Sequence, residues 1–279
     1  MEYDFRYEHF KSIYDFERVL NERPVSAPFE GHETSHDKGR DSFFKTVDFD
    51  EAQNLLEKGW DAKIGDIEDE MKKFLRLVVV KKSKQVKSVA GFAPCVPNAI
   101  RGVPKSMFAT RILPKKETKR SVHIVFNNSA NAQTEADDLI KSGLTVLKLA
   151  YILDRHGIRV KIDMVPKMSY NNESVYGCTV NIKEYRQPFN LLKIAYPLAH
   201  VSFFRRHGFR YLETLPEIKN KGFVGGYGSS MIYADKKIKD AYFKFAGFLS
   251  DDVVYIDFKD VSESGFEYQK LAEAKGIEV

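Results

Sequence analysis

Three polar residues after a short apolar run have the spacing of ligands in a cation-binding loop. In "VHIVFNNSANAQTEADD", Asn127, Ser129 and Asn131 alternate along the chain, which lets their side chains converge. Hard cations such as Mg²⁺ favour carboxylate oxygens, because anionic ligands offset the cost of dehydrating the ion. Amide and hydroxyl oxygens give only a neutral, weak site. The loop therefore predicts a polar pocket without a tightly bound cation or cofactor, held by side-chain to backbone hydrogen bonds at the start of the following helix.

A second candidate set interleaves aromatic and basic side chains. The segment "HVSFFRRHGFRY" carries Arg205, Arg206 and Arg210 among its phenylalanines. Aromatic rings stack on bases and arginines hold phosphates, so this segment is a candidate for nucleic-acid binding, together with the lysines between residues 81 and 87. The alternative is the end of an amphipathic helix with buried phenylalanines and exposed arginines.

A glycine-rich stretch, "GFVGGYGSS", is the third candidate. It lacks the Gly-Lys-Ser/Thr ending of a nucleotide-binding P-loop, so it predicts a surface loop. Gly225, Gly226 and Tyr227 are candidate partner contacts within it, because loops at this end of a sheet often bind partners. Elsewhere no grouping of His, Cys, Ser, Asp or Glu has the spacing of a catalytic or metal site, so we predict no catalytic residues.

Strands and helices alternate from residue 121 onwards, and they would position the candidate residues. Residues 122–126 read as a buried strand, and residues 135–156 as a long helix ended by Gly157. The pattern predicts an α/β fold with a mostly parallel sheet and helices on both faces. In such sheets ligands lie beyond the carboxyl ends of the strands, which is where the 127–131 loop falls.

The preceding residues predict a different organisation. Residues 3–20 have apolar residues at helical spacing, and "TVDFDEAQNLLEKGW" predicts a helix capped by Asp48 or Asp50 and ended by Gly59. Another helix is expected over residues 64–80, followed by a proline-rich connector at 90–104 that docks on the next domain. We therefore expect a mainly helical N-terminal region at 1–119 and an α/β domain at 120–279.

The C-terminal half resembles a von Willebrand factor A-type domain, which has a Rossmann-like fold. In that family the loop after the first strand reads Asp-x-Ser-x-Ser, and it holds a divalent cation with a threonine and an aspartate from two later loops. Asn127 stands at the aspartate position, Ser129 matches the first serine and Asn131 replaces the second. The resemblance thus implies a degenerate metal site. By fold analogy it also implies a protein-binding adaptor, with an AAA+ ATPase as one class of partner.

The whole chain is similar to an uncharacterised family of phage and prophage proteins. The similarity rests on "SFFKTVDFDEAQNLLEKGW", "VPNAIRGVPKSM", residues 122–162, and "FFRRHGFR" followed by "GYG". It implies a phage-encoded protein in the cytoplasm of an infected bacterial host.

Composition agrees with a soluble cytoplasmic chain. The 279 residues are 43% hydrophobic and 30% charged, and the formal net charge of +5 permits nucleic acid without requiring it. Cys95 and Cys178 lie too far apart in sequence to indicate a disulfide framework, which favours a reducing compartment. No apolar run approaches the ~20 residues of a membrane span, and the charged N-terminus has no signal-peptide core, so we expect no membrane association.

These observations predict a non-enzymatic protein-interaction module with a degenerate metal-binding loop. The main alternative is a nucleic-acid-binding protein that uses residues 203–211 and the lysine runs. A metal-dependent hydrolase is a third class, but the carboxylates that such chemistry requires are missing from the loop.

Overall fold

The chain folds as two compact units, one of residues 1–67 with 120–279 and one of residues 68–119. The computed structural model describes residues 4–25, 34–61, 65, 68–69, 83–112, 121–131, 133–170, 174–215, 227, 229–250 and 252–277. The unit of residues 1–67 and 120–279 is called the main unit below, and that of residues 68–119 the small unit.

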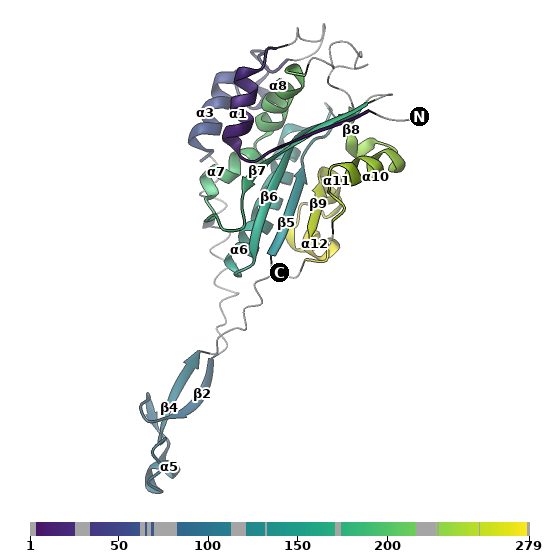
Figure 1. Cartoon of the computed structure of the whole chain (residues 1–279). Helices are drawn as coiled ribbons and strands as arrows, with labels where there is room; N and C mark the ends of the chain where they lie inside the picture. Colours follow the sequence, from purple (N-terminus) through teal and green to yellow (C-terminus); the bar gives the residue numbers. More distant parts are fainter. Residues whose placement is uncertain are drawn as a thin grey trace. The chain divides into compact units, whose positions relative to one another are not determined.

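A mostly parallel sheet forms the centre of the main unit (Figure 1). Its strands follow the order β1-β7-β6-β5-β9, and β8 pairs with β6. The pairs β1–β7, β5–β6 and β5–β9 are parallel, whereas β6 is antiparallel to both β7 and β8. The strands are β1 (Asp4–Phe10), β5 (Ser121–Asn127), β6 (Arg159–Tyr170), β7 (Ser174–Lys183), β8 (Ser229–Ser230) and β9 (Val253–Asp257).

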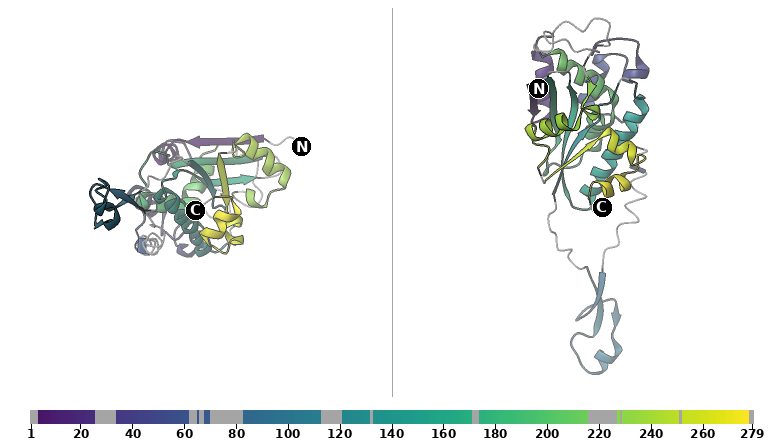
Figure 2. Two further views of the ribbon diagram at one scale, coloured as in Figure 1. Left: turned by 90° about the horizontal axis from the view of Figure 1, so that it is seen from below. Right: turned by 90° about the vertical axis from the view of Figure 1, so that its right-hand side faces the viewer.

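Helices cover the sheet on both sides (Figure 2). Their bounds are α1 (Ile13–Glu22), α2 (Asp41–Phe44), α3 (Phe49–Lys58), α6 (Ala136–Arg155), α7 (Leu191–Ala199), α8 (Gly208–Glu213), α10 (Lys236–Phe245), α11 (Phe258–Glu263) and α12 (Tyr268–Ala274). A π-helical turn, η1 (Phe203–His207), leads into α8, and a 3₁₀ turn, η2 (Met231–Tyr233), follows β8. The predicted α/β class with a mostly parallel sheet is therefore confirmed.

The side chains of alternate strand residues determine which helices lie on each face. Val125 of β5, Val165 of β6 and Val175 of β7 pack against Tyr242 and Phe243 of α10. Helices α6 and α7 lie close together at Gly143, which has no side chain. A Cβ at this position would stand 2.3 Å from the Cα of Ala199. Burial of these apolar faces is the main stabilising contribution to the unit.

Two predicted helices match the structure closely. The long helix predicted over 135–156 is α6, with Glu135 and His156 as its flanking cap residues. Helix α3 begins after Asp48, whose carboxylate accepts the backbone N–H of Glu51 at 2.9 Å, and it ends at Gly59. Most of the helix expected over 64–80 lies outside the described residues.

The N-terminal segment differs from the prediction. Instead of one helix over residues 3–20, it forms strand β1 and then α1, and β1 pairs with β7 in the main sheet. Phe5 and Tyr7 alternate on one face of β1 and pack edge-on against Tyr242 and Phe248. The expected division at residue 119 therefore does not describe the structure, because residues 1–67 belong to the α/β unit and residues 68–119 form the second unit.

The small unit contains a three-stranded antiparallel sheet in the order β2-β4-β3. Its elements are β2 (Ser83–Ser88), β3 (Ala93–Pro94), α5 (Val96–Ile100) and β4 (Met107–Ile112). A hydrogen bond of 3.4 Å from Lys87 Nζ to Asn98 Oδ1 links β2 to α5. The proline-rich stretch expected to be an irregular connector is thus part of a small folded element.

Candidate functional site

The carboxyl ends of β5 and β9 lie side by side and carry the polar residues of the candidate site. In the parallel pairing of these strands, Asn127 is opposite Asp257. Asp257 also caps α11, since its carboxylate accepts the N–H of Asp260 at 3.0 Å and the Asp260 carboxylate accepts that of Asp257 at 2.8 Å. This reciprocal capping fixes the end of β9 at the edge where α/β sheets bind ligands.

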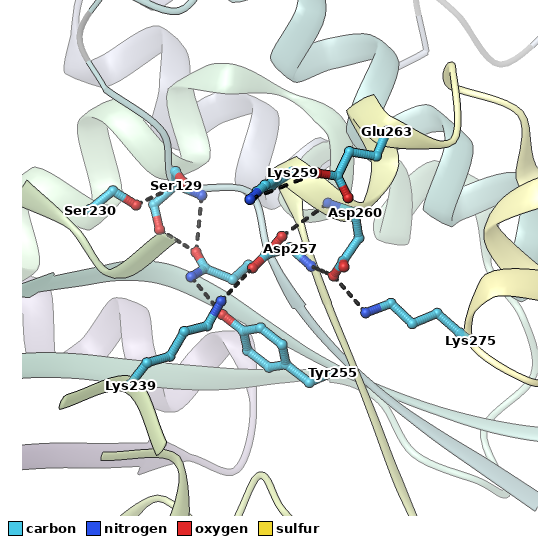
Figure 3. Close-up of polar contacts among 10 residues, drawn as sticks. Ser129, Ser230, Lys239, Tyr255, Asp257, Lys259, Asp260, Glu263 and Lys275 are labelled. Carbon is cyan, nitrogen blue, oxygen red and sulfur yellow. Dashed lines mark hydrogen bonds and ion pairs between the residues drawn. The ribbon is translucent and has the colours of Figure 1, made fainter. Parts of the chain in front are cut away.

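Two polar residues of the 127–131 loop, Asn127 and Ser129, are bonded to each other, and Figure 3 shows the contacts around Ser129. Asn127 Oδ1 accepts both the backbone N–H of Ser129, at 3.0 Å, and the Ser129 hydroxyl. Asn127 Nδ2 donates to the Tyr255 hydroxyl at 2.9 Å, and the Ser230 hydroxyl donates to the Ser129 carbonyl at 3.0 Å. Asn127 and Ser129 are buried, whereas Asn131 is exposed. The structure thus brings the first two residues together and leaves the third on the surface.

Lys239 adds a positive charge to the same edge. This residue of α10 places its ammonium 3.1 Å from Asp257 Oδ2, and Figure 3 shows Lys239, Tyr255 and Asp257 pointing toward one another. Burial, and then the nearby Asp257 carboxylate, raise the pKa of Tyr255 well above its usual value, so its hydroxyl is neutral at pH 7. Sequence reasoning missed Lys239, because nothing in "DKKIKD" distinguishes it from the neighbouring lysines.

These groups do not fit a divalent cation. Asn127 Oδ1 already accepts two hydrogen bonds, and the hydroxyl of Ser129 is used as a donor to it. The Lys239 ammonium faces the Asp257 carboxylate, so a cation would be repelled by one charge while approaching the other. In the part of the chain that the structure describes, no group of three or more His, Cys, Asp or Glu side chains is placed to hold a metal ion.

Arg205 and Arg206 lie inside the main unit rather than on its surface. Their exposed fractions are 1% and 0%. Arg205 donates to the carbonyls of Phe43 and Thr134, both at 2.7 Å. Its guanidinium carbon also lies 3.9 Å from the centre of the Phe43 ring. The sequence pattern had suggested exposed arginines, but a guanidinium in this position is not accessible to a nucleic acid.

Arg206 holds the segment of residues 34–46 in place. Its guanidinium donates to the hydroxyl and carbonyl of Thr46 at 2.6 and 2.8 Å, and to the carbonyls of Ser35 and Asp37 at 2.9 and 3.1 Å. It also lies 4.1 Å from the centre of the Phe44 ring. The arginine pair therefore has a structural role, because both guanidinium groups satisfy backbone carbonyls of the 34–46 segment.

The remaining predicted contacts have mixed positions. Arg210 is half-buried and donates from Nε to the Leu20 carbonyl at 3.3 Å. Tyr227 is buried, stacks on Phe209 with ring centres 4.1 Å apart, and donates its hydroxyl to Glu213. Gly225 and Gly226 lie outside the described residues. Tyr227 therefore belongs to the interior and is not available as a surface contact.

Exposed apolar side chains gather in the small unit. Among the side chains that the structure describes in residues 83–112, Cys95 is the only hydrophobic one that is buried. The exposed fractions are 71% for Val89, 63% for Phe92, 57% for Val96, 80% for Ile100 and 39% for Val103. We call these five residues the apolar surface. This surface was not predicted from the sequence, because the prolines indicated an irregular connector and gave no sign of which side chains would be exposed.

No helix among the described residues is both long and apolar enough to cross a membrane. Neither the curated proteins nor the solved structures contain a match to this chain. Residues 5–262 match a family defined by a domain of unknown function, DUF7192. That match includes both the edge at Asn127 and Asp257 and the whole of the small unit. The chain therefore belongs to the DUF7192 family.

Proposed function

We propose that this chain is a non-enzymatic protein-interaction module that binds its partner through the apolar surface of the small unit. The observation that carries the proposal is the exposure of Val89, Phe92, Val96, Ile100 and Val103 within a single short segment. Scattered exposed hydrophobic residues are normal, but a local concentration of them is typical of a protein–protein interface.

The carboxyl edge of the main sheet supports a non-catalytic role. The side chains of Asn127 and Ser129 bond to each other, and Lys239 neutralises Asp257. An active site needs donors and acceptors directed at a substrate. In this proposal the main unit is a von Willebrand A-like scaffold whose cation loop is degenerate.

Three further elements belong to the proposal and rest on sequence similarity or fold analogy. They are a phage origin, a location in the cytoplasm of the infected bacterium, and an AAA+ ATPase as one class of partner. Nucleic-acid binding remains a second candidate function only through the lysines of residues 81–87 and the small unit, because Arg205 and Arg206 are buried.

The central test is capture of partners by the tagged full chain from the cells in which it is expressed. A Phe92→Ser/Ile100→Ser variant should lose the captured proteins, whereas Tyr14→Ser, which alters an apolar side chain with 79% exposure in the main unit, should retain them. Equal capture by all three proteins would overturn the assignment of the apolar surface. The thermal midpoints of all three should agree, because each change is at an exposed position.

A second measurement tests the loop. Thermal melts in millimolar Mg²⁺, Mn²⁺ or Ca²⁺ should match those in chelator. A cation present at ~100 times its dissociation constant would add ~2.7 kcal/mol of stability, a shift of several degrees. Such a shift, abolished by Ser129→Ala, would show a working cation site and would contradict the degenerate assignment.

A further inference from the structure

We propose that the partner of the small unit is an acidic protein segment that also carries apolar side chains. This inference rests on the proposed function and adds the chemistry of the partner. Residues 83–112 contain Lys84, Lys87, Arg101, Lys105 and Arg111 and no aspartate or glutamate. Their charge equals the formal net charge of the entire chain, +5. The positive excess of this protein is therefore concentrated where its apolar surface is exposed.

Exposed cationic and exposed apolar residues are close neighbours along the chain at the end of α5 and after it. Val96 and Ile100 are four residues apart on this helix, so they share one face. On the side of the helix away from Val96 and Ile100, Lys87 donates to Asn98 Oδ1 at 3.4 Å and Asn98 Nδ2 donates to the carbonyl of Lys105 at 3.0 Å. Arg101 directly follows Ile100, and Lys105 follows Val103 by two residues, with all four side chains exposed. A partner that covers Ile100 and Val103 would therefore meet positive charge close by, and carboxylates on that partner would be favoured.

The open edge of the small sheet fits an extended protein segment. Among the residues that the structure describes, β2 is an end strand in the order β2-β4-β3, so its outer side is placed to pair with an added strand. Lys84 and Lys87 lie on this strand. A second copy of β2 would bring like charges together, whereas an acidic strand would bring opposite charges together.

The same features disfavour nucleic acids and anionic membranes as partners of the small unit. Binding of single-stranded nucleic acid relies on aromatic rings that stack on bases, but four of the five residues of the apolar surface are aliphatic. Helices that lie on anionic membranes have a long amphipathic face, whereas α5 has five residues. Lipid also offers no backbone partner for an edge strand.

Selection of a displayed random peptide library on the full chain tests this inference. The recovered peptides should be enriched in Asp and Glu together with Val, Ile, Leu or Phe. A synthetic peptide from the selection should bind at least tenfold more weakly to Lys105→Glu and to Ile100→Ser. The matched controls Lys244→Glu and Leu249→Ser, both at exposed positions of the main unit, should bind as the wild-type chain does.

The possible outcomes separate the two proposals. Recovery of neutral or basic peptides, or of none, would overturn the acidic partner, as would equal binding by Lys105→Glu. If Phe92→Ser/Ile100→Ser still lost captured proteins in that case, the proposed function would stand. Tighter binding to single-stranded DNA or to phosphatidylglycerol vesicles, weakened by the same two substitutions, would assign the surface to nucleic acid or lipid instead. A lower thermal midpoint for Ile100→Ser than for the wild-type chain would show that Ile100 packs within this chain and would overturn the proposal.

Discussion

Replacement of Arg206 by alanine tests the structural role assigned to the buried arginines. The change removes donors to the hydroxyl and carbonyl of Thr46 and to the carbonyls of Ser35 and Asp37, at 2.6 to 3.1 Å. It also removes the planar group stacked on Phe44. The acceptors all belong to the 34–46 segment, so this segment should detach from η1 and α8.

The expected cost is large because the site is fully buried. A hydrogen bond with a charged partner contributes about 1.5–3 kcal/mol, and an acceptor left unsatisfied in the interior costs about 1–3 kcal/mol. These contributions are not additive, because the segment will relax and admit water. We therefore expect a loss of about 3–5 kcal/mol, comparable to that from breaking a buried ion pair. Arg210→Ala, which removes one 3.3 Å contact of a half-buried side chain, should cost only about 1 kcal/mol.

Urea unfolding followed by fluorescence measures both losses. Trp60 is the only tryptophan of the chain, and its buried ring lies 5.0 Å from that of His200, so its emission reports on unfolding of the main unit. If Arg206→Ala does not fold, Thr46→Val removes only the hydroxyl acceptor and should cost about 1–2 kcal/mol. A loss below about 1 kcal/mol for Arg206→Ala, or equal losses for Arg206→Ala and Arg210→Ala, would refute the role assigned here.

Three further predictions concern the main unit. Leu147→Ala should cost about 2–5 kcal/mol in urea unfolding, because Leu147 is fully buried on α6; a cost under 1 kcal/mol would contradict its position. Burial lowers the pKa of His200 to about 4 and that of His207 to about 3. As pH falls below ~6.5, these histidines are therefore protonated in the unfolded chain before they are protonated in the folded chain. The free energy of unfolding should then fall between pH 6.5 and 4 by up to ~1.4 kcal/mol per histidine and pH unit. His207→Gln should reduce that slope, and an unchanged slope would exclude His207 as a contributor. A double-mutant cycle of Lys239→Met with Asp257→Asn should give a coupling of about 1 kcal/mol, since the lysine is partly exposed; zero coupling would show that the pair does not interact in solution.

Helices were predicted correctly where the capping residues in the sequence and the tertiary packing favour the same structure. Helix α3 has Asp48 before it and Gly59 after it, and the structure uses both. Helix α6 follows a buried strand and ends before Gly157, whose φ of +80° favours glycine. In these places the capping residues and the apolar period indicate the same structure, so the sequence alone was sufficient.

Tertiary pairing overrode the local pattern at the N-terminus. Phe5, Phe16 and Leu20 fit a helical period, yet residues 4–10 form β1 because β7 offers a parallel edge for them. A pairing across this distance in sequence leaves no local signal. The arginines were misplaced for a related reason. A basic side chain is normally exposed, and only the fold shows that residues 34–46 supply the carbonyls that bury Arg205 and Arg206.

The edge at Asn127 and the small unit differ in how they can respond to a second molecule. At the edge, the donors and acceptors of Asn127 and Ser129 are bonded within the chain, and the charge opposite Asp257 is Lys239. The Lys239 ammonium is part of the chain, so it stays beside Asp257 when free cations are diluted or chelated. The charge of this edge is therefore independent of the concentration of free cations. The small unit is the opposite case, because Lys87, Arg101 and Lys105 and the apolar surface all face solvent. Binding there should weaken with salt through the charges and persist through the apolar contacts. That combination distinguishes an acidic, partly apolar protein segment from a polyanion held by charge alone.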